Sequence, residues 1–195
     1  TVMELNAVPC LSLEDVALVK QQIMSSRSFG NYVYDLEPLK EAVASYVATA
    51  AEKLRGQGSV AGMIQVYVRT NPHKENAAQY SKGLTIPLPD SSDDTLYLTR
   101  VALWGLRRIY RPGFAYQKAG VVLMNLTDAA NQQESLFGAH RDNDRVMAVM
   151  DRVNAIWGRG TLRSAATGIA KSWAMRREKM SPRYTTEWDQ LPVAI

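Results

Sequence analysis

Cysteine and histidine are almost absent from the sequence, which contains one Cys and two His in 195 residues. The single Cys10 excludes an internal disulfide framework and a cysteine-rich metal site. His73 and His140 lie far apart, and neither has a companion at the spacing of metal ligands. The sequence therefore predicts neither disulfide bonds nor a structural zinc.

Long apolar runs and common catalytic motifs are also missing. No run approaches the roughly 20 residues of a membrane helix and no segment resembles a signal peptide, so we expect a soluble, cytoplasmic protein without membrane contact. The chain has no phosphate-binding glycine loop and no nucleophile-elbow motif. Its carboxylates are scattered over helix starts and loops, whereas two-metal nucleotidyl transfer needs them clustered. We therefore predict no catalytic residues, no metal site and no cofactor in this chain.

The composition is that of a globular protein, and its positive charge is concentrated near one end. Hydrophobic residues make up 46% of the chain and charged residues 22%, which is enough for a real core. Between Gly158 and Tyr184, seven basic residues stand against one acidic residue, Glu178. Such a segment predicts a polyanionic partner, the alternative being a solvated helix face.

The hydrophobic pattern between residues 20 and 126 switches between the period of strands and that of helices. We expect strands at 20–29, 62–70, 83–89 and 114–126, and helices at 35–55 and 95–111. Asp93 and Asp94 precede the second helix and are interpreted as capping rather than catalytic carboxylates. The order βαββαβ predicts an α+β fold, a four-stranded antiparallel sheet with two helices on one face.

The other face of this sheet is left bare, and polar side chains alternate onto it. Its expected residues are Gln65, Tyr67, Arg69, Thr85, Tyr116 and Lys118. A bare polar sheet face predicts a docking surface.

The C-terminal part begins with a third amphipathic helix, capped at Asn143 or Asp144 and ended by Gly158. Its apolar residues are Val146, Val149, Met150, Val153, Ile156 and Trp157. The remaining residues are basic and aromatic but contain too few periodic hydrophobes for a core of their own. We therefore expect them to pack on a neighbouring element or to become ordered on a ligand.

The segment NQQESLFGAH at 131–140 places Leu136 and Phe137 side by side in polar surroundings, with neither a helical nor a strand period. The pair is therefore not expected to belong to the core.

Several short segments occur in an order typical of one family. They are SRSFG at 26–30, AAEKLR at 50–55, YQKAGV at 116–121, QESLF at 133–137, VMDRVNAIWGRGTL at 149–162 and MSPRYTTEWDQLPV at 180–193. Together they resemble the C-terminal region of Y-family translesion DNA polymerases of the UmuC, MucB and RulB type, which act in SOS repair and mutagenesis. The resemblance covers essentially the whole chain.

This resemblance implies a domain organisation. Residues 1–19 would be the end of the thumb and a tether, 20–127 the little-finger DNA-binding domain, 128–142 a linker, and 143–195 a basic helical extension. The little finger of such polymerases lays its sheet in the DNA major groove and contacts mainly phosphates. The catalytic carboxylates lie in other domains, so Mg²⁺ and nucleotide are expected only for the full-length polymerase.

The resemblance also implies partners. Gln133, Leu136 and Phe137 match the Q-x-x-L-F pattern with which these polymerases bind the sliding clamp, the β subunit. In this interpretation the two apolar side chains fill a pocket on the clamp. The C-terminal region of the family is further implicated in contacts with the UmuD′ dimer and the RecA filament.

DNA-binding residues are expected on or beside the sheet face and in the basic C-terminal region. They are Arg27, Tyr67, Arg69, Lys74, Lys82, Gln117, Lys118, Arg159, Arg163, Arg176, Arg177 and Arg183. Trp173, Tyr184 and Trp188 are candidates for a second contact surface with DNA or with the protein partners, unless the Trp residues only pack the tail against the third helix. The alternatives are an RNA-binding module of the RRM type, which shares the βαββαβ order, and a protein-interaction scaffold.

Overall fold

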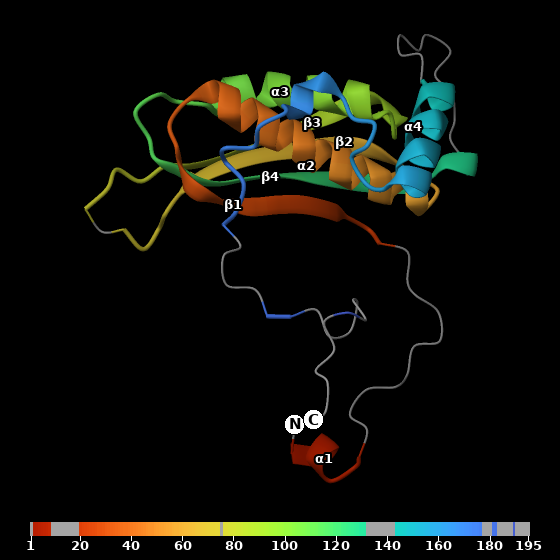
Figure 1. Cartoon of the computed structure of the whole chain (residues 1–195), viewed down its shortest axis with the longest axis horizontal. Helices are drawn as coiled ribbons and strands as arrows, with labels where there is room; N and C mark the ends of the chain where they lie inside the picture. The colour runs from red at the N-terminus through yellow and green to blue at the C-terminus, as the bar shows by residue number, and fades with distance from the viewer. Residues whose placement is uncertain are drawn as a thin grey trace.

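The computed structural model describes residues 2–8, 20–74, 76–131, 143–176, 181–182 and 189 (Figure 1). A short helix, α1 (Val2–Leu5), precedes the main domain. The elements of that domain follow in the predicted order: β1 (Ile23–Val33), α2 (Leu36–Gly56), β2 (Ser59–Thr70), β3 (Ser81–Ser92), α3 (Thr95–Ile109) and β4 (Tyr116–Asp128). After them come the 3₁₀ turns η1 (Ala129–Asn131) and η2 (Ala165–Thr167), with helix α4 (Asp144–Trp157) between them.

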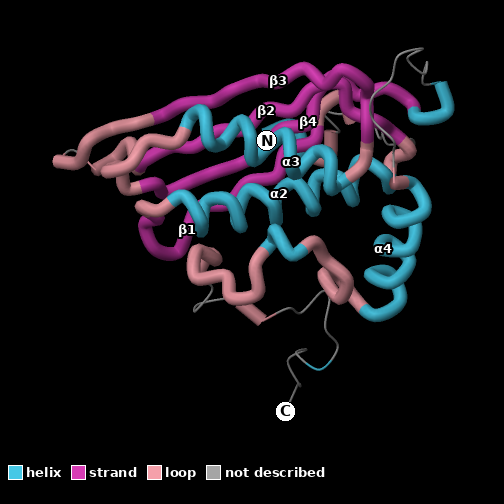
Figure 2. Tube along the Cα trace, turned by 90° about the horizontal axis from the view of Figure 1, so that it is seen from above, coloured by secondary structure: helices cyan, strands magenta, loops and turns pink. Residues whose placement is uncertain are grey.

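The four strands form one antiparallel sheet in the order β1-β4-β2-β3, and α2 and α3 lie side by side on one of its faces (Figure 2). Ile64, Val66 and Val68 of β2 are completely buried beneath these helices, as their alternation predicts. The proline-containing strand β3 lies at an edge, where missing backbone donors are tolerated. The predicted α+β fold is confirmed.

The carboxylate that precedes α3 has the predicted capping role. Asp94 is the N-cap residue, and its side chain accepts a hydrogen bond of 2.7 Å from the backbone N–H of Leu96. The backbone carbonyl of Asp93 accepts a hydrogen bond of 2.8 Å from Arg55 at the end of α2. Asp94 therefore caps α3, and Asp93 connects the start of α3 to the end of α2.

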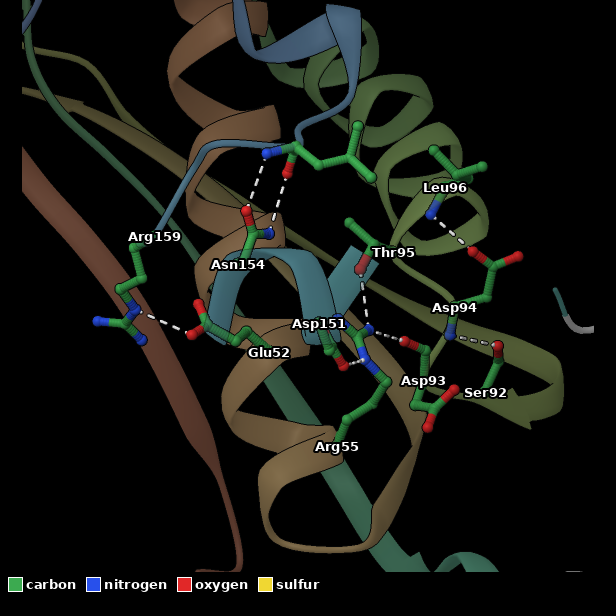
Figure 3. A network of polar contacts seen from close by, with 11 residues as sticks. Glu52, Arg55, Ser92, Asp93, Asp94, Thr95, Leu96, Asp151, Asn154 and Arg159 are labelled. Atoms are coloured by element: carbon green, nitrogen blue, oxygen red, sulfur yellow. Dashed lines mark hydrogen bonds and ion pairs between the residues drawn. The ribbon is translucent and has the colours of Figure 1, made fainter. Parts of the chain in front are cut away.

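Helix α4 lies across the end of the domain at which α2 ends and α3 begins (Figure 2). Arg55 of α2 forms two hydrogen bonds of 2.6 and 2.8 Å with the carboxylate of Asp151 in α4 (Figure 3). Asn143, just before α4, donates to the Asp94 carboxylate at 2.9 Å. Polar contacts to both helices therefore fix the position of α4.

The chain beyond α4 returns to the domain and covers the outer edge of β1. Trp173 is only 6% exposed and packs edge-on against Tyr46 of α2 and Phe29 of β1, with ring centroids 5.8 and 6.4 Å away. A Cβ atom at Gly30 would lie 2.5 Å from the carbonyl oxygen of Ala174, so only glycine allows this close approach. The described residues of the tail pack on β1 and α2, which is one of the two expected outcomes. Trp173 is buried against Phe29 and Tyr46, so it is neither a surface contact residue nor part of the expected packing against α4.

Within the described part of the chain, no helix has both the length and the apolar character needed to cross a membrane.

Candidate nucleic-acid interface

The face of the sheet turned away from α2 and α3 is the main candidate interface, and we call it the open face. Strand pairing brings alternate residues of all four strands to it. They include Ser26 and Ser28 of β1, Lys118, Gly120 and Val122 of β4, Gln65, Tyr67 and Arg69 of β2, and Ser81, Gly83 and Thr85 of β3, with the apolar Met24, Met63, Pro87 and Met124 toward one end of the face. Around Tyr67 these side chains are small or polar, whereas those around Met63 are apolar.

Tyr67 lies across the centre of the open face. Its register partners are Gly120 on β4 and Gly83 on β3. A Cβ atom at Gly120 would lie 2.6 Å from the Tyr67 hydroxyl oxygen and 2.5 Å from the Cβ of Ser26. The phenol therefore occupies the space that the glycine leaves free, and its hydroxyl points toward β1.

Two cations stand beside this tyrosine. Arg69 and Lys118 are directly opposite each other on β2 and β4. Neither forms an ion pair with any described residue. Like charges at opposed strand positions repel each other, so the pair lowers the stability of the sheet unless an anion binds between or beside them. The pair is therefore a candidate site for an anion.

Two of the expected cations, Arg27 and Lys82, lie on the other side of the sheet. Arg27 pairs with Ala119 and Lys82 with Val68, and both of these partners are buried beneath the helices. Pairing with a buried partner therefore assigns Arg27 and Lys82 to the helix-covered side rather than to the open face. Their expected contact with DNA stays a prediction.

Tyr116 was also expected on the open face, but it is completely buried. The register shifts between Arg69 and Thr70, so that Gln117 is an extra, half-buried residue in a bulge. The bulge brings Tyr116 to the core side, where its hydroxyl donates to the carbonyl of Arg111 at 2.9 Å and accepts from its N–H at 3.0 Å. Burial raises the pKa of Tyr116.

Lys74 lies in the connection between β2 and β3. Its ammonium group is 5.2 Å from the centroid of the Tyr32 ring, a cation–π distance. Lys74 therefore sits beyond the end of the sheet rather than on the open face.

A second group of cations lines a groove on the helix-covered side, which we call the basic groove. It has a volume of about 630 Å³ and is bounded by β1, α2, α4 and residues 159–175. Its cationic residues are Arg27, Arg55, Arg159, Arg163 and Lys171. The structure thus brings together three residues that the sequence analysis named separately, Arg27, Arg159 and Arg163.

Part of this positive charge is compensated within the protein. Arg159 donates to the Glu52 carboxylate at 2.9 Å, which raises the pKa of the guanidinium, and Arg55 is paired with Asp151 (Figure 3). Arg27, Arg163 and Lys171 form no ion pair with the described residues. The buried Tyr46 faces the groove near Arg27, and burial raises its pKa, so this phenol is neutral at physiological pH.

Arg176 donates to the side-chain oxygen of Asn31 at 2.6 Å and thus helps to hold the tail at the β1 edge. Arg177 and Arg183, the clamp-motif residues Gln133, Leu136 and Phe137, and the aromatic residues Tyr184 and Trp188 all lie outside the described residues.

Several residues that shape these two surfaces are not among the site residues expected from the sequence. Gly120 and Ser26 make room for Tyr67, and glycine inside a strand pattern is the available signal for such a close approach. Lys171 is one of the seven basic residues between Gly158 and Tyr184, but its position in the basic groove depends on long-range packing of the tail. The described residues contain no group of three or more His, Cys, Asp or Glu side chains that could hold a metal ion.

Comparison with protein families gives two matches. Residues 20–136 match the model of the impB/mucB/samB family C-terminal domain. Residues 144–194 match a domain of unknown function, DUF4113.

Similar proteins occur in enteric bacteria. Protein UmuC of Salmonella typhimurium is 41% identical over 98% of this chain, protein ImpB of the same organism 36% identical over the whole chain, and protein MucB of Escherichia coli 38% identical over the whole chain. In each case the chain spans 46% of the relative, about half its length.

Solved structures with a similar region include an insertion ternary complex of Dbh DNA polymerase, at 17% identity and a TM-score of 0.41. A DinB family error-prone DNA polymerase from Sulfolobus solfataricus matches at 15% identity and a TM-score of 0.43. Each similarity covers 55% of this chain, and 29% and 30% of the respective polymerase chain.

Proposed function

Because this chain belongs to the impB/mucB/samB family through its C-terminal domain, we propose that it is the non-catalytic, DNA-binding C-terminal region of an error-prone translesion DNA polymerase. The chain spans about half the length of its relatives. In this proposal the metal-binding carboxylates, Mg²⁺ and the nucleotide belong to the remainder of the full-length polymerase.

The main support for this proposal is the pair of opposed cations Arg69 and Lys118 on the open face, neither of which forms an ion pair with a described residue. Phosphate groups are the ligands that such a pair suits, and contacts to phosphates bind DNA without selecting its sequence. Tyr67 and Gln65 add hydroxyl and amide groups that can hydrogen-bond to the backbone of the duplex. A polymerase that must follow many template sequences needs this kind of contact.

The cations of the basic groove have a different place in the proposal. Arg27, Arg163 and Lys171 lie on the helix-covered side, so a duplex on the open face can approach them only where it passes the outer edge of β1. We therefore assign the main DNA surface to Arg69 and Lys118 and treat the groove as a secondary one.

An RRM-like function is less well supported. RRM domains stack bases on several aromatic side chains of the central strands. In β2 and β4, which are described completely, Tyr67 is the one aromatic residue on the open face.

We also propose that Gln133, Leu136 and Phe137 bind the β sliding clamp. Support comes from the motif itself and from its position in the sequence, just after β4 ends at Asp128. UmuD′ and RecA are the proposed protein partners, SOS mutagenesis the proposed process, and the bacterial cytoplasm the proposed location. These proposals rest on the family relationship.

Salt dependence of DNA binding tests the main proposal. The double variant Arg69→Ala/Lys118→Ala should bind a labelled duplex more weakly than the parent, and the slope of log K against log salt should fall by about 1.8, roughly 0.9 per lost phosphate contact. The control is Arg100→Ala/Arg107→Ala, which removes the same charge from exposed positions on α3. Equal slopes for the two double variants would refute the assignment of the DNA surface.

A further inference from the structure

Helix α4 turns its apolar side away from the domain. Val146 is 53% exposed, Val149 57%, Ile156 60% and Trp157 67%, whereas an amphipathic helix normally buries such a stripe. We call Val146, Val149, Val153, Ile156 and Trp157 the α4 stripe. An apolar stripe of this size on an ordered helix is typical of a binding surface.

The orientation of α4 is fixed by its opposite side. Met147 is buried against the domain, and the carboxylate of Asp151 accepts two hydrogen bonds from Arg55 in a bidentate ion pair. Asn154 both donates to the carbonyl of Leu162 and accepts from its N–H, each at 2.9 Å (Figure 3 shows Asn154 and Asp151 on this inner side). These three residues lie at i, i+4 and i+7, so the helix cannot rotate its stripe inward without breaking all of these contacts.

The spacing of the stripe fits another helix. Val146, Val149, Val153 and Ile156 follow one another at steps of three, four and three residues, the seam spacing of helices that pack side by side. One flank of this seam is basic. Arg145 and Arg152 are seven residues apart and therefore project from the same side of the helix. Both are exposed, and neither forms an ion pair within the described ranges.

We propose that α4 is a docking site for an amphipathic helix of a partner protein. The partner helix carries acidic residues beside its own apolar stripe, on the side that faces Arg145 and Arg152. The apolar seam supplies the affinity and the two arginines set the preference for an acidic flank. This inference does not depend on DNA binding by the open face.

A second copy of this chain suits the stripe less well. In an antiparallel pair of α4 helices, each flank meets the same flank of the other copy, so arginines would face arginines. In a parallel pair, Arg145 and Arg152 would face Met150 and Trp157. Neither arrangement gives the arginines an acidic partner.

Designed peptides provide the test. A labelled helical peptide of three heptads, with Leu at the seam positions and Glu on both flanks, is titrated with the 195-residue chain, and its fluorescence anisotropy is followed. The same peptide with Lys on both flanks serves as the competitor for specificity. The Glu-flanked peptide should bind about tenfold more tightly or better.

Two pairs of variants make the result specific to α4. Val149→Asp/Ile156→Asp should weaken binding about tenfold or more, whereas Ala148→Asp/Ala155→Asp, which adds the same charges at exposed positions beside the stripe, should change it less than about twofold. Arg145→Glu/Arg152→Glu should reverse the preference between the two peptides. Arg100→Glu/Arg107→Glu, an equal change of charge on α3, should leave that preference in place.

The proposal is wrong if the two peptides bind equally well, if neither binds, or if the stripe variant binds like the parent. Sedimentation of the unbound chain completes the test. Self-association that the stripe variant abolishes would identify a second copy as the occupant and would also overturn the proposal.

Discussion

The ring of Tyr67 fills the space above Gly120 on the neighbouring strand, so closely that a Cβ atom at residue 120 would lie 2.6 Å from the tyrosine hydroxyl. The two residues are also directly opposite each other on β2 and β4. Gly120 therefore determines the position of the Tyr67 ring relative to Arg69 and Lys118. Tyr67 is the one aromatic residue of β2 and β4 on the open face.

Gly120→Ala should displace Tyr67 and weaken DNA binding, and it should lower the free energy of unfolding by about 1–3 kcal/mol because the added methyl group overpacks the face. Urea denaturation and anisotropy measure the two effects. In a double-mutant cycle with Tyr67→Ala, the loss of stability caused by Gly120→Ala should be smaller than in the parent. Additive effects would show that the two residues do not compete for this space.

The ion pair between Arg55 and Asp151 should contribute more to stability than the pair between Arg159 and Glu52. Asp151→Asn should cost about 1–3 kcal/mol, because it leaves a guanidinium that is only 11% exposed without its counter-charge. Glu52→Gln should cost less than about 1 kcal/mol, since both partners of that pair are largely solvated. Equal costs in urea denaturation would contradict the proposed anchoring of α4.

Gly30→Val should push the C-terminal segment off β1, because its Cβ would lie 2.5 Å from the carbonyl oxygen of Ala174. Trp173 should then become accessible to water, and its emission should shift to longer wavelength and be quenched more strongly by acrylamide. Comparison with Trp173→Phe isolates the signal of this tryptophan. Gly56→Ala is the control, since a Cβ atom there meets open space. An unchanged Trp173 spectrum in Gly30→Val would contradict the packing described.

Leu136→Ala/Phe137→Ala should abolish clamp binding while leaving the fold intact. The change removes about 3–6 kcal/mol of gross apolar burial in the complex, enough to eliminate an interaction of micromolar strength. Calorimetric titration with the β clamp and urea denaturation of the free chain measure the two effects. Undiminished clamp binding, or an unfolded variant, would each refute the motif assignment.

Local signals predict much of this fold. The alternation of Ile64, Val66 and Val68 predicts which side of β2 is buried, and the carboxylate of Asp94 marks the start of α3 correctly. These features depend on neighbours in sequence, through the strand period and the capping of free N–H groups. The expected order of strands and helices follows from the same signals.

Features that depend on distant pairing are not predictable in this way. The bulge at Gln117 reverses the side of Tyr116, and only the partners Ala119 and Val68 show that Arg27 and Lys82 face the helices. The sequence around Trp173 indicates only a basic tail, and its burial follows from contacts with the distant residues Phe29 and Tyr46. The α4 stripe has the pattern of a buried face, but Met147, Asp151 and Asn154 turn it outward.

Chemical-shift mapping of the backbone amides during titration with a short duplex tests the assignment of the DNA surface to the open face, because it locates the bound DNA on the protein. We expect the largest changes in β2 from Gln65 to Arg69 and in β4 from Lys118 to Val122, with little change on the outer side of α3. Changes concentrated in residues 159–176 or on α3, with β2 and β4 unaffected, would contradict it.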